Sequence, residues 1–319
     1  MTSVASSETR PLATSVSRRR LDLGLVAGLA SAAAFGTAGP VAKALLGSGW
    51  SPAAVTLARI GGAAAILLIP ALLACRGRWP AVRAHAPLIL VFGLLAVAGA
   101  QLSYFNAVRT LPVGVALLVE YSGTVLVVLF IWATTRRRPA TTVIFGGVVS
   151  ILGLALVLDI AGQSRPDLTG VVYALGAAVG LAAYFLTASR GKDVLPATVI
   201  AGLGMVVAAL ALGVLGCARI LPMSFSTTPV TVAGTMTPWW AAVGELVLVA
   251  AVAAYLLGTF AARRLGPTLA SFVGLAEVLA AVLFAWLLLG ELPRPVQLLG
   301  GVLVVAGVVA VRLGERPAR

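Results

Sequence analysis

Ten long apolar segments, joined by short polar links, dominate this sequence. Of its 319 residues 60% are hydrophobic and only 10% are charged, which is far from the composition of a soluble globular domain. A membrane-spanning helix needs ~20 largely apolar residues. The sequence therefore predicts an all-α multi-pass membrane protein with ten transmembrane helices, at about residues 22–46, 52–75, 87–108, 112–134, 141–161, 169–189, 194–217, 238–261, 268–289 and 295–313.

The basic residues are distributed unevenly between the two sides of these spans. A net charge of +13 would suggest a nucleic-acid partner in a soluble protein. With the N-terminus inside, however, 17 of the 23 Lys and Arg residues fall on the inner side, as the positive-inside rule requires. We therefore expect both termini in the cytoplasm and no nucleic-acid partner. The apolar run after Arg20 is too long for a signal sequence, so we expect residues 1–20 to form a cytoplasmic tail.

A shift of 154 residues aligns the two halves of the chain without a gap. It places Val128–Trp132 on Val282–Trp286, Gly146–Val148 on Gly300–Val302, and Gly153 on Gly307. Each half then holds five spans, and an odd number reverses the orientation of the second half. We expect two inverted-topology five-helix repeats with a cavity between them. The predicted boundaries are 21–162 for the first repeat, 163–313 for the second and 314–319 for a cytoplasmic tail.

Short motifs in both halves match a known family. The first half carries Tyr104–Val108 and Val113–Tyr121; the second carries Arg264–Thr268, Gly274–Glu277, Trp286–Glu291 and Leu299–Gly301. In these motifs, and over roughly residues 22–313, the chain resembles EamA-type members of the drug/metabolite transporter superfamily. The resemblance implies ten helices in two EamA repeats. It also implies a permease of the bacterial cytoplasmic membrane for small metabolites, often an exporter of amino acids or related compounds.

Four charged side chains lie well inside the predicted spans, away from their ends, where a charge costs about 2.5–3.5 kcal/mol: Arg59, Glu120, Glu245 and Glu277. The first three follow a helix-starting proline by seven or eight residues, so a rise of ~1.5 Å per residue puts them at similar depth. Under the 154-residue shift Glu277 falls three residues from Glu120, on an equivalent helix face.

Two interpretations of these charges stay open. Arg59 is either an ion-pair partner of Glu120 or Glu245 that fixes helix packing, or it contacts the substrate, as the glutamates also can. Because dehydration disfavours a charged carboxyl group, we expect Glu120 or Glu277 to carry a coupling proton.

Further polar candidates are Gln101, Tyr104 and Asn106 on the third helix and Tyr255, which aligns with Gln101, on the eighth. They either bind a polar solute or bond neighbouring helices. We find no phosphate-binding loop, metal-ligand cluster or nucleophile triad, so we expect no cofactor, no metal and no enzymatic activity. The longest outer link, residues 218–237, is more simply a linker than a lid.

The combined features predict a secondary transporter that moves a small polar or amphipathic metabolite by alternating access, more often outward, with a proton as the candidate coupling ion. Its partners are then the small-molecule substrate and the lipid bilayer; the sequence does not specify an oligomeric state. Two alternatives remain. An intramembrane enzyme acting on a lipid-linked substrate needs clustered carboxylates or histidines, whereas the only histidine is His85. A channel would conduct without saturation or counterflow.

Overall fold

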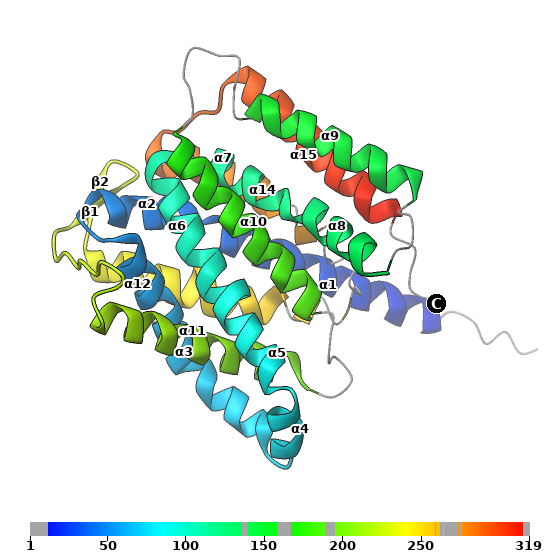
Figure 1. Ribbon diagram of the computed structural model, residues 1–319, viewed down its shortest axis with the longest axis horizontal. Helices are drawn as coiled ribbons and strands as arrows, with labels where there is room; N and C mark the ends of the chain where they lie inside the picture. The colour runs from blue at the N-terminus through cyan, green and yellow to red at the C-terminus, as the bar shows by residue number, and fades with distance from the viewer. Residues whose placement is uncertain are drawn as a thin grey trace, which may run out of the picture.

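The computed structural model describes residues 12–135, 140–157, 167–188, 195–258, 260–261, 264, 273–274 and 276–314. Most of these residues are helical, and helices far apart in the sequence lie side by side (Figure 1). The elements in chain order are α1 (Leu12–Gly36), α2 (Ala38–Gly47), α3 (Pro52–Cys75), α4 (Trp79–Ala84), α5 (Ala86–Val91), η1 (Phe92–Gly99), α6 (Ala100–Thr110), α7 (Val113–Tyr121), α8 (Gly123–Thr135), α9 (Thr141–Val157), α10 (Leu168–Ala188), α11 (Ala197–Cys217), β1 (Val230–Val232), β2 (Thr235–Thr237), α12 (Trp239–Val247), η2 (Leu248–Ala253), α14 (Ala276–Leu289) and α15 (Pro295–Gly314).

The described helices make this a multi-pass membrane protein. Five helical stretches are long and apolar enough to cross a membrane: Asp22–Gly47, Pro52–Cys75, Ala86–Thr110, Thr198–Cys217 and Trp239–Gly258. Four shorter apolar helices lie within further predicted spans: Thr141–Leu156, Leu168–Tyr184, Ala276–Leu289 and Pro295–Gly307. The total of ten spans stays a prediction, since parts of the segments around residues 158–166, 189–194 and 265–272 lie outside the described residues.

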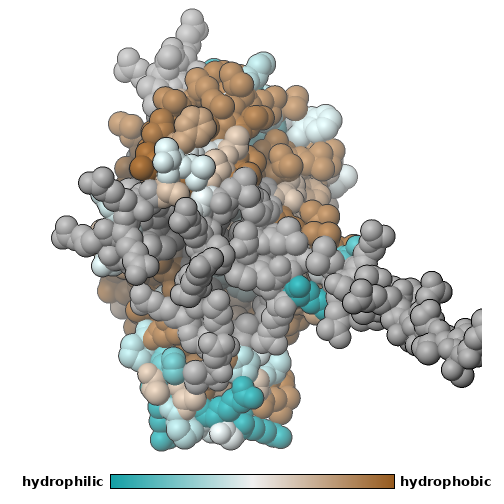
Figure 2. Space-filling model, turned by 90° about the vertical axis from the view of Figure 1, so that its right-hand side faces the viewer, coloured by the Kyte–Doolittle hydropathy of each residue, from teal (hydrophilic) through white to brown (hydrophobic). Residues whose placement is uncertain are grey.

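Large apolar side chains face outward from the helices. Ile69, Phe145, Val172, Leu210 and Leu279 are each about two-thirds exposed, and brown hydrophobic residues cover much of the described surface in Figure 2. The buried positions are instead rich in alanine. In a membrane, small residues between helices let their backbones approach closely. This surface therefore fits a hydrocarbon environment.

Two segments of π-helix occupy equivalent places in the two halves. The 154-residue shift maps η1 (Phe92–Gly99) onto residues 246–253, which contain η2 (Leu248–Ala253). Such segments widen the backbone spiral and often occur at functional sites. Gln101 and Tyr255, which the shift also equates, each lie two residues after the π-helix in their half. The duplication predicted from the sequence is therefore repeated in an unusual backbone feature.

The pair formed by α9 and α15 also follows the repeat. The two helices run side by side (Figure 1), and a Cβ atom at Gly153 would lie 2.7 Å from the carbonyl oxygen of Gly300. Reciprocally, a Cβ atom at Gly307 would lie 2.5 Å from the carbonyl oxygen of Gly146. The shift equates Gly146 with Gly300 and Gly153 with Gly307, so the contacts are those that a pseudo-two-fold axis between the repeats predicts.

The link between α11 and α12, within residues 218–237, is a folded hairpin rather than a plain linker. Strands β1 and β2 pair antiparallel, with Val230 opposite Thr237 and Val232 opposite Thr235. Ala233 and Gly234 both have positive φ, 51° and 74°, as a tight two-residue hairpin turn requires. The Ala233 N–H donates to the carbonyl oxygen of Leu288 on α14 at 2.9 Å.

The same link also bonds the first half of the chain. The Trp50 indole N–H, at the corner between α2 and α3, donates to the carbonyl oxygen of Ser226 at 2.8 Å. The interpretation of this segment as a mere connection is therefore wrong, because it is tied to elements of both halves.

Candidate functional site

A small cavity brings five of the predicted site residues together. It has about 30 Å³ of free volume and is lined by Phe35, Ala38, Arg59, Gln101, Tyr104, Leu117, Glu120, Glu277 and Ala281. These residues come from α1, α2, α3, α6 and α7 of the first half and from α14 of the second. A water molecule needs ~10–15 Å³ measured in this way. The cavity thus has room for water but not for a metabolite.

Among the described residues, Arg59 on α3 is the only basic one that lines this cavity. It is buried, and its Nη1 donates to Oε1 of Gln101. Its Nη2 donates to the carbonyl oxygen of Ala250, within η2, at 2.8 Å. Arg59 therefore joins the two equivalent regions of the repeats: Gln101 follows η1, and Ala250 belongs to η2.

The ion pair considered for Arg59 is not formed. Within the described residues the structure has one ion pair, between Lys43 and Glu291, and neither Glu120 nor Glu245 lies within 4.0 Å of the Arg59 guanidinium nitrogens. Its neighbours are neutral acceptors and the ring of Phe105, whose centroid lies 5.7 Å from the guanidinium carbon. Glu120 nevertheless lines the same cavity as Arg59, whereas Glu245 does not.

Glu120 and Glu277 both line the cavity, as expected for equivalent faces of two related helices. Glu120 is buried on α7. Glu277, in the first turn of α14, accepts a hydrogen bond from the Tyr121 hydroxyl at 3.1 Å. Tyr104 from α6 completes the polar lining and is buried. One guanidinium group and two carboxyl groups thus surround one small space.

Three predicted residues do not line this cavity. Asn106 Nδ2 donates to the carbonyl oxygen of Leu102 in its own helix, at 2.8 Å. Tyr255 packs edge-on against Phe35, with ring centroids 5.1 Å apart. Glu245 on α12 accepts a hydrogen bond from the Thr37 hydroxyl, between α1 and α2. For Asn106 the structure favours a role within its own helix, and the other two lie beside the cavity rather than in it.

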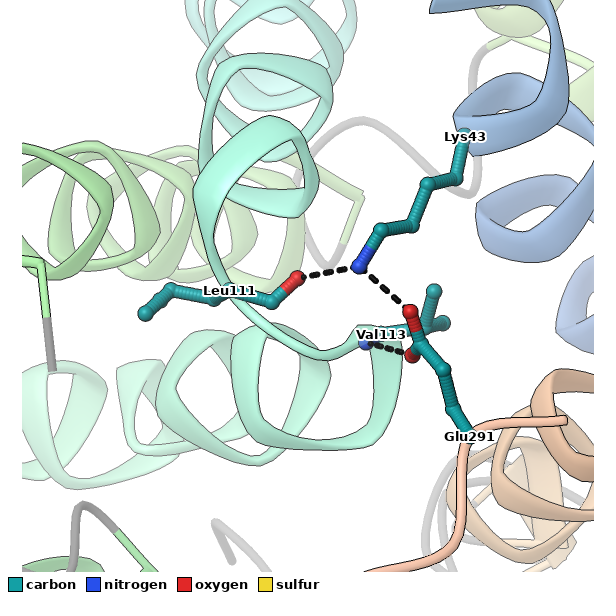
Figure 3. Close-up of polar contacts among 4 residues, drawn as sticks. All are labelled: Lys43, Leu111, Val113 and Glu291. Atoms are coloured by element: carbon teal, nitrogen blue, oxygen red, sulfur yellow. Dashed lines mark hydrogen bonds and ion pairs between the residues drawn. The ribbon is translucent and has the colours of Figure 1, made fainter. Parts of the chain in front are cut away.

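A polar network that was not predicted from the sequence joins the two halves near the ends of α2, α6 and α14 (Figure 3). Lys43 Nζ lies 2.5 Å from Glu291 Oε1, and each side chain is about a quarter exposed. Lys43 also donates to the carbonyl oxygen of Leu111, which ends α6, at 3.0 Å. Glu291 Oε2 accepts from the N–H of Val113, which begins α7, at 3.0 Å.

This network satisfies helix ends as well as pairing charges. A cation stabilises the C-terminus of α6 and an anion the N-terminus of α7, as the helix dipole favours. The signal that could have revealed it is a lysine within the first apolar span, together with a carboxyl group directly after the ninth. Neither Lys43 nor Glu291 was among the predicted site residues.

A multi-pass helical protein built of two related halves, with a charged cavity between them, has the architecture of a membrane transporter. The model of the EamA-like transporter family matches residues 22–159 and 168–313. The chain therefore belongs to the EamA-like transporter family, and the predicted resemblance is confirmed.

Named relatives agree with this assignment. The threonine/homoserine exporter RhtA of Escherichia coli K12 is 30% identical over 232 residues, which are 71% of this chain and 70% of the exporter. RhtA of Salmonella typhimurium LT2 is 36% identical over 115 residues; this match spans 35% of the chain and only 37% of that relative. The uncharacterized transporter YwfM of Bacillus subtilis 168 is 26% identical over 290 residues, 88% of this chain and 91% of YwfM.

A solved crystal structure shows the same fold. It is 20% identical, superimposes with a TM-score of 0.58, and the match covers 94% of this chain and 97% of that one. At this identity the likeness concerns the fold alone.

Proposed function

We propose that this protein exports a small zwitterionic metabolite, an amino acid or a close relative, by alternating access between its two halves. The main support for this proposal is the cavity, which one guanidinium group and two carboxyl groups line at the junction of the repeats. The names of the RhtA relatives support an amino acid as the cargo. The same proposal assigns residues 21–162 and 163–313 to inverted repeats, with both termini in the cytoplasm.

The charges of the cavity suit the two ends of an amino acid. A guanidinium group has five N–H donors, and two of the Arg59 nitrogens donate to Gln101 and Ala250. The remaining donors are available for a solute carboxylate, the group that arginine recognises best. Of Glu120 and Glu277, one then contacts the solute ammonium group and the other carries the coupling proton. Tyr104 adds a hydroxyl group for a polar side chain.

The size of the cavity supports a moving mechanism. With about 30 Å³ of free volume, the described conformation is too narrow for an amino acid. The helices that line it have to separate before the solute enters. On the expected topology the Lys43–Glu291 network lies on the outer side, so it closes the cavity toward the exterior. The protein then opens outward by breaking that network and inward by parting the opposite ends of the same helices.

Reconstituted proteoliposomes test the proposal. We expect vesicles loaded with threonine or homoserine to accelerate uptake of the labelled solute, with saturation, and a pH gradient to increase the flux. Glu120→Gln and Glu277→Gln separate the two carboxyl groups, and Asp167→Asn, an exposed carboxyl group outside the cavity, is the matched control. A Glu→Gln variant that expresses normally and keeps pH-dependent, gradient-driven flux eliminates that residue as the proton carrier. Flux without saturation or counterflow would indicate a channel and refute the proposal.

A further inference from the structure

A break in the helix, called the bend, separates α1 from α2 beside the cavity. Pro40 lacks an N–H group, so the carbonyl oxygen of Gly36 loses its helical partner, and α1 ends at Gly36 while α2 begins at Ala38. Thr37 lies between the two helices, and its neighbours Phe35 and Ala38 both line the cavity. Any change in the geometry at Thr37 therefore changes the shape of the cavity directly.

The Thr37 hydroxyl group has two acceptors within reach. Its Oγ1 lies 2.7 Å from the carbonyl oxygen of Ala34, in the last turn of α1, and it also contacts Oε1 of Glu245 on α12. A hydroxyl group carries one proton and donates one strong hydrogen bond. Both contacts are fully satisfied only when Glu245 is a neutral acid whose O–H donates to Thr37, which in turn donates to Ala34.

When Glu245 loses its proton, the hydrogen bonds must change direction. The carboxylate can only accept, so Thr37 turns its proton to Glu245 and withdraws it from Ala34. The proton of Glu245 therefore decides whether Thr37 is bonded to both α1 and α12 or to α12 alone. This is a two-state element located at the bend.

The surroundings of Glu245 are suited to a group that changes protonation. Its Oε2 atom is buried and has no hydrogen-bond partner among the described residues. The elements packed against α12 are α2, α3 and η2. From α2 comes Lys43, which is paired with Glu291; from α3 comes Arg59, bonded to Gln101 and Ala250; η2 has no titratable side chain. Among the described residues, a charge on Glu245 thus has no direct counter-ion, and Arg59 makes its hydrogen bonds to other groups.

We propose that Glu245 is a proton-binding site separate from the cavity carboxyl groups, and that Thr37 transmits its protonation state to the bend between α1 and α2. The proposal rests on the proposed transport function and adds a second proton site to it. Binding of the proton locks Thr37 to α1, and its release frees the bend. Coupling then arises because the bend carries two residues of the cavity wall.

Infrared spectroscopy tests the proton site without any transported solute. We expect purified wild-type protein to show a carboxylic-acid C=O band that Glu245→Gln removes and that Asp167→Asn leaves intact. Thr37→Val, which keeps the shape but removes the hydroxyl group, should shift that band, and Thr37→Ser should not. An unchanged spectrum in Glu245→Gln overturns the proposal, because the carboxyl group is then ionised throughout.

Transport tests the coupling. In Glu245→Gln and in Thr37→Val we expect solute counterflow to continue while the stimulation by a pH gradient falls by about fivefold or more, the lower end of typical coupling factors. The double variant should lose no more than either single variant, and Thr37→Ser should behave like wild type. Full gradient stimulation in Glu245→Gln would refute the coupling. Absence of counterflow in wild type would instead refute the proposed function, while the infrared result would still stand.

Discussion

The Lys43–Glu291 network permits a quantitative prediction about outward closure. Glu291→Gln keeps an oxygen that can accept from the Val113 N–H but removes the charge that faces Lys43. Hydrogen bonds to charged groups contribute about 1.5–3 kcal/mol, whereas exposed ion pairs contribute about 0–1 kcal/mol. The two side chains are 26% and 24% exposed, so we take about 1–2 kcal/mol between these limits. That corresponds to a population of the outward-open state that rises by about 5–30-fold.

Thiol accessibility measures this shift. Ala38 is buried and lines the cavity, so a cysteine placed there, with Cys75 and Cys217 replaced, reacts with an outside, membrane-impermeant reagent only after outward opening. The reaction rate should rise by about 5–30-fold in Glu291→Gln. Lys43→Met should give a similar increase, and the double variant should react no faster than either single variant, because both break the same interaction.

The control for this experiment is Asp167→Asn. Asp167 is an exposed carboxyl group whose Oδ1 accepts from the N–H of Thr169 at 2.7 Å, at the start of α10. On the expected topology it lies on the same outer side but outside the network. Equal reaction rates in Glu291→Gln, Asp167→Asn and wild type would refute the reasoning, since the ion pair would then contribute nothing to closure.

Three further predictions follow from single contacts. Arg59→Lys keeps the charge but loses the planar fork that binds carboxylates. We expect the half-saturating solute concentration to rise by about tenfold, from the ~1.5 kcal/mol at the lower end for one charged hydrogen bond. An unchanged value in counterflow assays contradicts the binding role. Gly153→Ala should lower the free energy of unfolding by about 1–3 kcal/mol, because its Cβ would lie 2.6 Å from the Val304 nitrogen. The control Gly147→Ala, whose Cβ would lie 3.8 Å from its nearest atom, should be neutral. Equal melting temperatures of the two variants in detergent would show that α9 and α15 do not pack this closely. Backbone N–H groups, first that of Thr169, hold the pKa of Asp167 below its ordinary value of 3.8. The carboxylate therefore stabilises the fold above that pH and loses this effect as the pH falls through the lower folded pKa. The melting temperature of Asp167→Ala should lie below that of wild type at neutral pH and approach it in acid, and a constant difference would count against these hydrogen bonds at the start of α10.

The repeat was predictable because it leaves a direct trace in residue identity. Gly153 and Gly307 match under one shift, since both positions need a residue without a side chain where α9 and α15 meet. The shift alone did not show that Gly153 faces Gly300. That contact depends on how the two halves are placed in space, which an alignment of the chain with itself does not contain.

The partners of Arg59 were not predictable for a similar reason. Counting residues from Pro52 gives the depth of Arg59 along its helix, but not the direction in which the side chain points. The Ala250 carbonyl oxygen is an acceptor within η2. Neither η2 nor the equivalent π-helix η1 contains a proline that would mark such a segment in the sequence. A change in backbone register of this kind has no distinctive residue pattern, so the sequence left an ion pair and a substrate contact open and did not indicate these neutral acceptors.

The neutral partners of Arg59 explain how one cation can serve a cavity with two carboxyl groups. A direct ion pair with Glu120 would have used the charge of both, and breaking such a buried pair costs about 3–5 kcal/mol. Gln101 and the Ala250 carbonyl group hold the guanidinium in place without cancelling its charge. Under the proposed function, a solute carboxylate would therefore meet an oriented cation and have no counter-ion to displace. With Arg59 positive, the charges of the cavity balance when one of Glu120 and Glu277 keeps its proton. A zwitterion adds no net charge to that balance, which is why a neutral amino acid suits this site better than an anionic or a cationic solute.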